Sequence, residues 1–251
     1  MYQFFVDPGA ISEKQVVITG KDVNHIKNVL RMKTGEEIAV SNGVDGREYR
    51  CGILQMTEDA VICELRFIKE DGVELPSKIY LFQGLPKADK MELIIQKAVE
   101  LGVYEIIPVA TKRAVVKLDA KKEKSKLARW QAISEAAAKQ SKRAVVPQVH
   151  SVMSYAEALT YADMLDVRLI PYEMAEDMAK TRSLIEEIRP GQSIGIFIGP
   201  EGGFAPEEIE QAMAHATQPI TLGKRILRTE TAGMTVLSIL MYTLEGQELK
   251  A

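Results

Sequence analysis

Cysteines, long hydrophobic runs and a basic leader are scarce or missing in this chain of 251 residues. Two cysteines, Cys51 and Cys63, cannot build a disulfide framework, and they form a zinc site only if histidines join them. The longest apolar runs, Ile194–Ile198 and Leu237–Leu244, fall far short of the ~18 residues that a membrane helix needs. The first residues contain no basic segment followed by an apolar one, so we expect no secretory signal. These absences predict a cytoplasmic protein that uses neither a membrane nor a metal.

The composition is that of a folded protein, but its charge is unevenly distributed. Hydrophobic residues make up 46% of the chain and charged residues 27%, which is typical of a globular protein. Residues 1–72 carry 9 Lys/Arg and 12 Asp/Glu, residues 73–150 carry 15 and 8, and residues 151–251 carry 8 and 15. The basic middle block favours a polyanionic partner such as a nucleic acid, although a solvated helix face explains a lysine run equally well.

The first part of the chain has the pattern of a small β-domain. The expected strands are Phe4–Val6, Val16–Ile18, Glu37–Ser41, Glu48–Leu54 and Ala60–Phe67. Turn residues such as Asn42-Gly43 separate them, and one helical stretch runs from Asp22 to Leu30. Several short, mostly antiparallel strands predict a small β-barrel over residues 1–72.

From residue 73 onward, strands alternate with helices. The expected strands are Ile79–Phe82, Tyr104–Val109, Val167–Ile170, Ile194–Ile198 and Pro219–Thr221. The expected helices are Lys87–Leu101, Lys124–Gln140, Thr181–Ile188, Pro206–Ala214 and Glu230–Leu244. Alternation with apolar strands predicts an α/β domain over residues 73–251, with a mostly parallel sheet covered on both faces.

A glycine-rich loop follows one of these strands, with the sequence IGPEGGF at Ile198–Phe204. Glycines let a ligand approach the backbone, and ligands of open α/β sheets bind beyond the carboxyl ends of the strands. The spacing is not that of G-x-G-x-x-G, and G-K-[ST] is absent, so a dinucleotide fingerprint and a phosphate loop are excluded. A tight turn without a ligand remains the alternative.

A second loop, LGKRILRTETA at Leu222–Ala232, also lies between an expected strand and a helix. It carries Lys224, Arg225 and Arg228 just before the helix, which indicates a site for an anion or for developing negative charge. The alternative is structural, because Thr229 could cap the helix and Glu230 is favourable at a helix N-terminus.

Together, these loops resemble the cofactor loops of the SPOUT methyltransferases. More narrowly, the chain resembles the RsmE family of 16S ribosomal RNA uridine-N3 methyltransferases over essentially its whole length. The resemblance also rests on His25 with Val29-Leu30-Arg31, on Gly84–Val103 and on Glu135–Arg143. It implies a trefoil-knotted α/β SPOUT domain, a PUA-like N-terminal barrel, a homodimer and S-adenosyl-L-methionine as cofactor.

The resemblance also implies roles for individual residues. The cofactor would be held by residues of the two loops: Ile198, Gly199, Gly202, Gly203, Leu222, Gly223, Ile226, Leu227, Thr231 and Ala232. RNA would contact His25 and Arg31 in the first domain and the basic block, for which we name Lys112, Arg113, Lys121, Lys122, Lys142 and Arg143. The target would be one uridine of 16S ribosomal RNA within the small ribosomal subunit.

The chemistry of such a reaction points to the second loop. Uracil N3 becomes a good nucleophile when its weakly acidic proton leaves, and the resulting negative charge needs stabilisation. Arg228 is suited to that role because a guanidinium stays charged. Glu230 or Glu201 could accept the proton if burial raises the pKa, although a structural carboxylate is the alternative for Glu201. His25, in the other domain, could act only if a dimer brings it close.

Three rival functions differ in the loops that they require. A SPOUT enzyme that methylates a ribose 2′-hydroxyl would carry a G-S-E-G loop and an S-L-N-V segment, whereas this chain has Pro200 and Arg228-Thr229-Glu230. A non-catalytic RNA-binding assembly factor would not need the intact glycines of both loops. A nucleotide-dependent dehydrogenase or kinase lacks its loops here.

Overall fold

The computed structural model describes residues 1–69, 72–175 and 177–247. The chain divides into two compact units, each described here by itself. The first comprises Met1–Glu74 and Ala138–Val146, and the second comprises Leu75–Ala137 and Pro147–Ala251.

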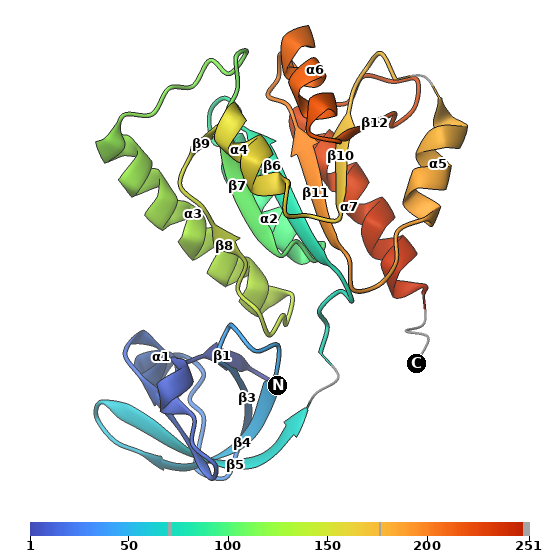
Figure 1. Ribbon diagram of the computed structural model, residues 1–251. Helices are drawn as coiled ribbons and strands as arrows, with labels where there is room; N and C mark the ends of the chain where they lie inside the picture. The colour runs from blue at the N-terminus through green and yellow to red at the C-terminus, as the bar shows by residue number, and fades with distance from the viewer. Residues whose placement is uncertain (70–71, 176, 248–251) are drawn as a thin grey trace. The chain divides into compact units, whose positions relative to one another are not determined.

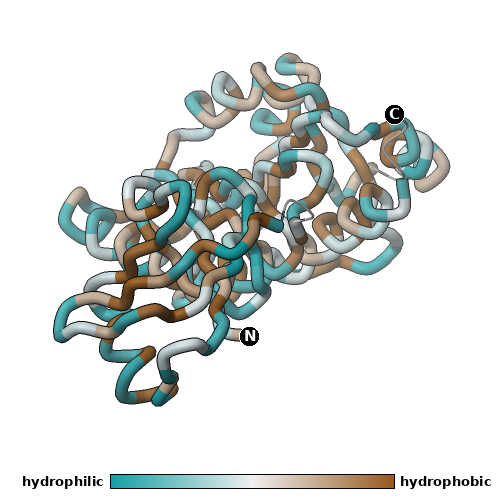
Figure 2. The backbone as a smooth tube through the Cα atoms, turned by 90° about the horizontal axis from the view of Figure 1, so that it is seen from below, coloured by the Kyte–Doolittle hydropathy of each residue, from teal (hydrophilic) through white to brown (hydrophobic). Residues whose placement is uncertain are grey.

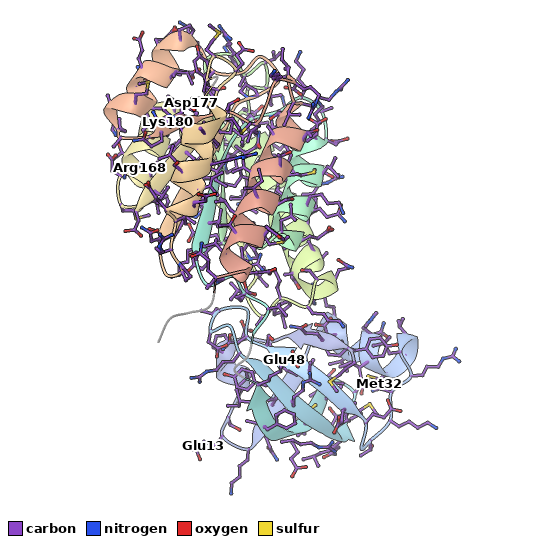
Figure 3. The ribbon with its side chains drawn as sticks, turned by 90° about the vertical axis from the view of Figure 1, so that its right-hand side faces the viewer. Glu13, Met32, Glu48, Arg168, Asp177 and Lys180 are labelled. Atoms are coloured by element: carbon purple, nitrogen blue, oxygen red, sulfur yellow. The ribbon has the colours of Figure 1, made fainter. Side chains whose placement is uncertain are left out.

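The first unit is a five-stranded sheet in the order β1-β3-β4-β5-β2. Its strands are β1 (Gln3–Phe5), β2 (Gln15–Thr19), β3 (Glu37–Ser41), β4 (Glu48–Met56) and β5 (Ala60–Lys69). All pairs are antiparallel except β1 with β3, which run parallel. Alternating side chains of these strands and Met32 form the hydrophobic core of this unit (Figure 3).

The helical stretch expected between Asp22 and Leu30 is present but changes its type. A single α-helical turn, α1 (Lys21–Asn24), continues into the π-helical η2 (His25–Val29), and a short 3₁₀ turn, η1 (Pro8–Ala10), precedes them. Val23 and Ile26 point into the core as their spacing predicts. The wider π turn is not visible in that spacing, and π geometry in other proteins often marks a functional segment.

Residues 138–146, which we expected in the second unit, pack in the first. The Gln3 side chain donates a hydrogen bond to the Arg143 carbonyl (2.9 Å), and the Val146 N–H donates to the Gly43 carbonyl (3.0 Å). The chain thus returns to the first unit before it completes the second.

The second unit contains a parallel sheet in the order β12-β10-β11-β6-β7-β8, with β9 also paired to β7. Its strands are β6 (Lys78–Gly84), β7 (Glu105–Ala110), β8 (Gln148–Val149), β9 (Met153–Ser154), β10 (Val167–Pro171), β11 (Ser193–Ile198) and β12 (Gln218–Ile220). All strand pairs in this sheet run parallel among the described residues, which confirms the predicted architecture.

Helices cover both faces of this sheet, with α2 and α7 on one face and α4 on the other (Figure 1). The helices are α2 (Lys90–Glu100), α3 (Ala120–Gln140), α4 (Tyr155–Ala162), α5 (Met178–Glu186), α6 (Pro206–Ala214) and α7 (Thr229–Glu245). Under α4, the rings of Phe82 and Phe197 stack with centroids 4.4 Å apart. Figure 2 shows hydrophobic and hydrophilic residues interspersed along the backbone, with hydrophilic residues at many of the outer turns.

Side-chain caps define where several helices begin. The Ser154 hydroxyl accepts from the Glu157 N–H while the Glu157 carboxylate accepts from the Ser154 N–H, which closes a capping box on α4. The Asp177 carboxylate accepts from the Lys180 N–H (2.9 Å) at the start of α5 (Figure 3). Within the described residues, no helix is both long and apolar enough to cross a membrane.

Candidate cofactor and RNA site

The two loops singled out in the sequence lie at the carboxyl edge of the parallel sheet. The first leaves β11 at Ile198 and enters α6, and the second leaves β12 at Ile220 and enters α7 (Figure 1). β6 pairs with β11, so that Gln83 stands beside Ile198. This edge is where ligands bind in open α/β sheets.

Glycine is required in the first loop by close backbone contacts. A Cβ added to Gly84 would lie 2.7 Å from Pro200 Cδ, and one added to Gly199 would lie 3.0 Å from the Gly203 carbonyl carbon. Gly203 has φ +66° and donates its N–H to the Pro200 carbonyl (2.9 Å). The loop is therefore a tight turn pressed against the end of β6, and larger side chains would force it apart.

The same loops leave backbone accessible to a ligand. A Cβ added to Gly203 would meet no atom within 4 Å, and Gly223 has φ +104° with only Met178 Cε at 4.0 Å. In the second loop, Ile226 is 87% exposed and Leu227 is half-buried. Open glycine backbone beside apolar side chains fits the adenine and ribose parts of S-adenosyl-L-methionine.

The remaining predicted cofactor residues belong to the same loops and to the first turn of α7. Leu222 and Ala232 are half-buried, Thr231 and Gly202 are exposed, and Ile198 is buried at the end of β11. A chain of hydrogen bonds ties the segments together. The Gln83 amide donates to the Thr229 hydroxyl (2.9 Å), which donates to the Gly199 carbonyl (2.6 Å).

Glu201 and Glu230 meet at one lysine. Lys90 Nζ lies 3.2 Å from an oxygen of each carboxylate, and the Lys87 N–H donates to both oxygens of Glu201 (3.1 and 3.3 Å). Burial by itself would raise the pKa of Glu201, but backbone N–H groups and the Lys90 ammonium together lower that pKa. Glu201 therefore has the geometry of a structural carboxylate and is a weak base.

Arg228 stands at the entrance of α7 with its side chain exposed. Within the described residues, no hydrogen bond or ion pair holds its guanidinium, so it is available to a ligand. Arg228 is also the N-cap residue, and its side chain makes no capping bond. Thr229, the capping residue considered from the sequence, is the first residue of the helix instead, and its hydroxyl bonds Gly199.

Two of the predicted RNA-contacting residues border the first loop. The Lys112 ammonium pairs with Glu207, and the Lys112 N–H donates to Glu208 (2.8 Å). Arg113 donates to the Gly202 carbonyl (2.9 Å). Basic side chains thus adjoin the loop that faces the proposed cofactor.

The other predicted RNA contacts are divided between the two units. Lys121 and Lys122 are exposed on α3, where Lys122 pairs with Asp119 (3.3 Å). In the first unit, His25 is exposed beside Phe4, with ring centroids 6.4 Å apart, and Arg31 is exposed with φ +54°.

The end of the basic block departs from expectation. Lys142 is exposed with φ +60°, but Arg143 is only 3% exposed, and its guanidinium donates to Glu74 (2.5 Å). Since the Glu74 carboxylate also accepts from the Ala144 and Val145 N–H groups, Arg143 holds the returning segment in place. This burial and pairing argue against Arg143 as an RNA contact and assign it a structural role.

Known proteins that are similar to this chain include RNA methyltransferases. A family model described as an RNA methyltransferase domain matches residues 73–241, and one described as an RNA methyltransferase PUA domain matches residues 18–66. The ribosomal RNA small subunit methyltransferase E of Bacillus subtilis (strain 168) is 39% identical over 231 residues, which are 91% of this chain and 90% of the relative. The chain belongs to the ribosomal RNA small subunit methyltransferase E family. The predicted family is thereby confirmed.

Solved structures of similar proteins extend this assignment to ligands. The ribosomal RNA small subunit methyltransferase E of Neisseria gonorrhoeae, bound to S-adenosyl methionine, has a TM-score of 0.81 and 33% identity, covering 96% of this chain and 97% of that one. A methyltransferase of Legionella pneumophila, in complex with the same cofactor, has a TM-score of 0.81 and 31% identity, covering 96% of both chains. The fold of this family member is thus one that holds the cofactor in related proteins.

Two residues of the site were not found from the sequence of this family member. Gln83 is a polar residue at the end of the apolar strand β6, a position that could have marked it. Lys90 opens α2 and carries no comparable signal, because both of its partners are distant in the chain. Within the described residues, no group of three or more His, Cys, Asp or Glu could hold a metal.

Proposed function

We propose that this protein transfers a methyl group from S-adenosyl-L-methionine to N3 of one uridine in 16S ribosomal RNA. We place this reaction on the small ribosomal subunit in the cytoplasm. The observation that carries the proposal is the pair of loops at the carboxyl edge of the sheet. They leave the backbone of Gly203 and Gly223 open, in a chain whose relatives are solved with this cofactor.

The cofactor, when bound, supplies an electrophilic methyl group. The residues that would hold it are Ile198, Gly199, Gly202, Gly203, Leu222, Gly223, Ile226, Leu227, Thr231 and Ala232. Backbone groups of the glycines would bind its polar parts, and Leu222, Ile226 and Leu227 would cover its apolar surface.

The residues around the methyl acceptor have different tasks. Arg228, whose guanidinium is exposed and unpaired within the described residues, stabilises the negative charge that spreads over the uracil carbonyls. Glu230 accepts the N3 proton, and Lys90 holds its carboxylate in place. We give Glu201 a structural role instead, because its carboxylate accepts from the Lys87 N–H in addition to its contact with Lys90, and these groups lower its pKa.

Ribosomal RNA would be bound by residues of both units. We assign His25, Arg31 and Lys142 of the first unit and Lys112, Arg113, Lys121 and Lys122 of the second unit to RNA binding. The support is their charge and exposure, together with the family model of the first unit, which is described as an RNA methyltransferase PUA domain. The proposal keeps a PUA-like RNA-binding domain at residues 1–72, to which Ala138–Val146 return, and a SPOUT methyltransferase domain, with its trefoil knot, in the rest of residues 73–251.

We also propose that the protein is a homodimer. α2 and α7 lie against each other on one face of the sheet, and they present exposed apolar side chains. Tyr242 of α7 is 81% exposed and Leu93 of α2 is 43% exposed. Such side chains are more favourable in an interface than in water.

The proposed reaction can be tested directly. Small ribosomal subunits from cells that lack this protein are incubated with it and methyl-labelled S-adenosyl-L-methionine. The RNA is then digested to nucleosides, and the labelled nucleoside is identified by mass spectrometry. We expect the label in 3-methyluridine. Label on a ribose would overturn the base specificity, and absence of label from all nucleosides while the protein binds the cofactor would overturn the proposed substrate.

A further inference from the structure

We propose that Gln83 and Thr229 are positioning residues that fix the distance between the two cofactor loops. This inference rests on the proposed function and deepens it. Gln83 lies near the end of β6, Gly199 starts the first loop, and Thr229 begins α7 directly after the second loop. Two side chains therefore join three segments that lie far apart in the sequence.

The directions of these hydrogen bonds follow from their partners. The carbonyls of Gly84 and Gly199 can only accept, so Gln83 must turn its NH₂ group to Gly84 (3.0 Å), and Thr229 must donate its hydroxyl hydrogen to Gly199 (2.6 Å). The Thr229 oxygen then accepts the second Gln83 hydrogen (2.9 Å). If the Gln83 amide were rotated by 180°, its oxygen would face the carbonyl oxygen of Gly84, and neither atom can donate a hydrogen bond. Only the observed orientation of the amide therefore satisfies all three hydrogen bonds.

Gln83 is not placed for stability alone. Its side chain is fully buried, and its carbonyl oxygen Oε1 has no hydrogen-bond partner among the described residues. A buried acceptor without a partner costs free energy, and an apolar side chain of the same size would avoid that cost. A Cβ added to the nearby Gly233 would stand 3.8 Å from Oε1, an ordinary van der Waals contact, so a larger residue there would not force the amide to turn. A buried amide kept at such a cost indicates that its NH₂ group has a task.

The task follows from what the Thr229 hydroxyl holds. Gly199 is pressed against Gly203, the residue whose open backbone faces the proposed ligand. A displacement of Gly199 therefore moves Gly203, and loss of the Thr229 bond frees Gly199 from the start of α7. The affinity for the cofactor depends on a fixed distance between the two loops. Loops that are already held at this distance before the cofactor binds reduce the free-energy cost of binding.

Three variants and a matched control test this role. Thr229→Val keeps the shape but removes the hydroxyl, Thr229→Ser keeps the hydroxyl, and Gln83→Met removes the amide at nearly constant volume. The control is Thr243→Val, because the Thr243 hydroxyl also donates to a carbonyl of α7, that of Ile239 (2.8 Å), but far from the loops. For each full-length variant, the dissociation constant for S-adenosyl-L-methionine is measured by calorimetry and the melting temperature by circular dichroism.

We expect Thr229→Val to weaken cofactor binding roughly tenfold, the effect of one lost hydrogen bond in a preorganised site. Thr229→Ser and Thr243→Val should bind like the wild type. Gln83→Met should weaken binding by more than its change in melting temperature accounts for, because removal of the unpartnered oxygen offsets part of the cost of the two lost hydrogen bonds. Replacement of a purely structural residue would lower the cofactor affinity and the melting temperature together.

Two results would overturn the inference. Wild-type affinity in Thr229→Val would mean that the hydroxyl does not set the loop separation. A Gln83→Met variant that loses affinity only in proportion to its melting temperature would make Gln83 a structural residue. If the wild-type protein itself fails to bind the cofactor, the proposed function fails as well, so the two failures are distinguished by the wild-type measurement.

Discussion

At the amino edge of the parallel sheet the polar side chains around Glu105 bond one another, whereas the carboxyl edge combines paired side chains with an exposed arginine and with side chains that bond the backbone. Glu105, at the start of β7, accepts from His150 Nε2 and from the Tyr161 hydroxyl, each at 2.8 Å. Lys78 places its ammonium 4.6 Å from the ring centre of Tyr104. These groups satisfy each other and leave little for a ligand.

The carboxyl edge also contains paired side chains, since Lys90 contacts both Glu201 and Glu230, but it leaves other groups open. Gln83 and Thr229 are used to hold backbone carbonyls, and Arg228 is left exposed. Gly203 and Gly223 have conformations that suit glycine, and they leave the backbone open. Within one sheet, then, an exposed arginine beside open glycine backbone distinguishes the edge for binding, whereas paired titratable groups occur at both edges.

A matched pair of glycines offers the sharpest test of this difference. Gly203 follows β11 at its carboxyl edge and Gly191 precedes it at its amino edge, and both have positive φ (+66° and +91°) in open space. Gly203→Val and Gly191→Val should cost similar stability, about 1–2 kcal/mol for a left-handed side chain. Only Gly203→Val should weaken S-adenosyl-L-methionine binding, roughly 100-fold, because its side chain fills ligand space. Equal affinity of both variants in calorimetry would place the cofactor elsewhere.

The exposed cation at the carboxyl edge should affect turnover more than binding. Arg228→Ala is expected to lower kcat by about 100-fold, since it removes a donor to developing negative charge, with little change in cofactor affinity. Arg182→Ala, an exposed arginine on α5, serves as the control and should keep wild-type kcat. Single-turnover methylation of small subunits gives the rates. A variant that loses affinity but keeps its turnover at saturation would make Arg228 a binding residue.

The basic start of α3 follows the carboxyl end of β7, and it provides a test with a smaller effect. Lys121 and Lys124 lie one helical turn apart and are both exposed, so their charges act on one surface. Changing both to Glu should weaken RNA binding roughly tenfold and make its dependence on salt concentration shallower, because fewer phosphates are neutralised and fewer counterions are released. The control changes Lys180 and Arg182 to Glu, with the same shift in net charge. If the α3 variant and the control variant lose equal RNA affinity in filter binding, the loss is due to net charge alone, and the start of α3 is not an RNA contact.

Local patterns in the sequence were sufficient for most elements. α6 begins and ends as expected at Pro206–Ala214, because a strand, a glycine loop and a helix-starting proline follow one another. α4 was missed, although Ser154 and Glu157 stand at the spacing of a capping box. β8 and β9 have two residues each, too few for any periodicity.

The site was predictable where its signal is local and not where it depends on distant partners. The glycines of both loops are visible in the sequence, and two of them, Gly203 and Gly223, have positive φ. Arg143 looked like part of a basic face because its partner, Glu74, lies 69 residues away. Lys90 was overlooked for the same reason, since its two carboxylates, Glu201 and Glu230, belong to loops much later in the chain. Pairing across the fold is set by tertiary structure and has no local pattern.

The smallest expected effect concerns the closed amino edge. Burial raises the pKa of Glu105, but hydrogen bonds from His150 and Tyr161 outweigh burial, so its pKa is lowered. A carboxylate with a lowered pKa adds stability above its unfolded pKa of about 4.3, and this stability is lost as the pH falls through the lower folded value. Glu105→Gln should therefore melt roughly 2–4 °C below the wild type at neutral pH, the effect of about 1 kcal/mol. This difference should disappear as the pH falls below the lowered pKa of Glu105, where both side chains are uncharged. Glu210→Gln, on the exposed side of α6, should not change the melting temperature, and cofactor affinity should stay constant in both variants. A melting difference for Glu105→Gln that persists unchanged in acid would mean that the charge of this edge contributes nothing to the fold.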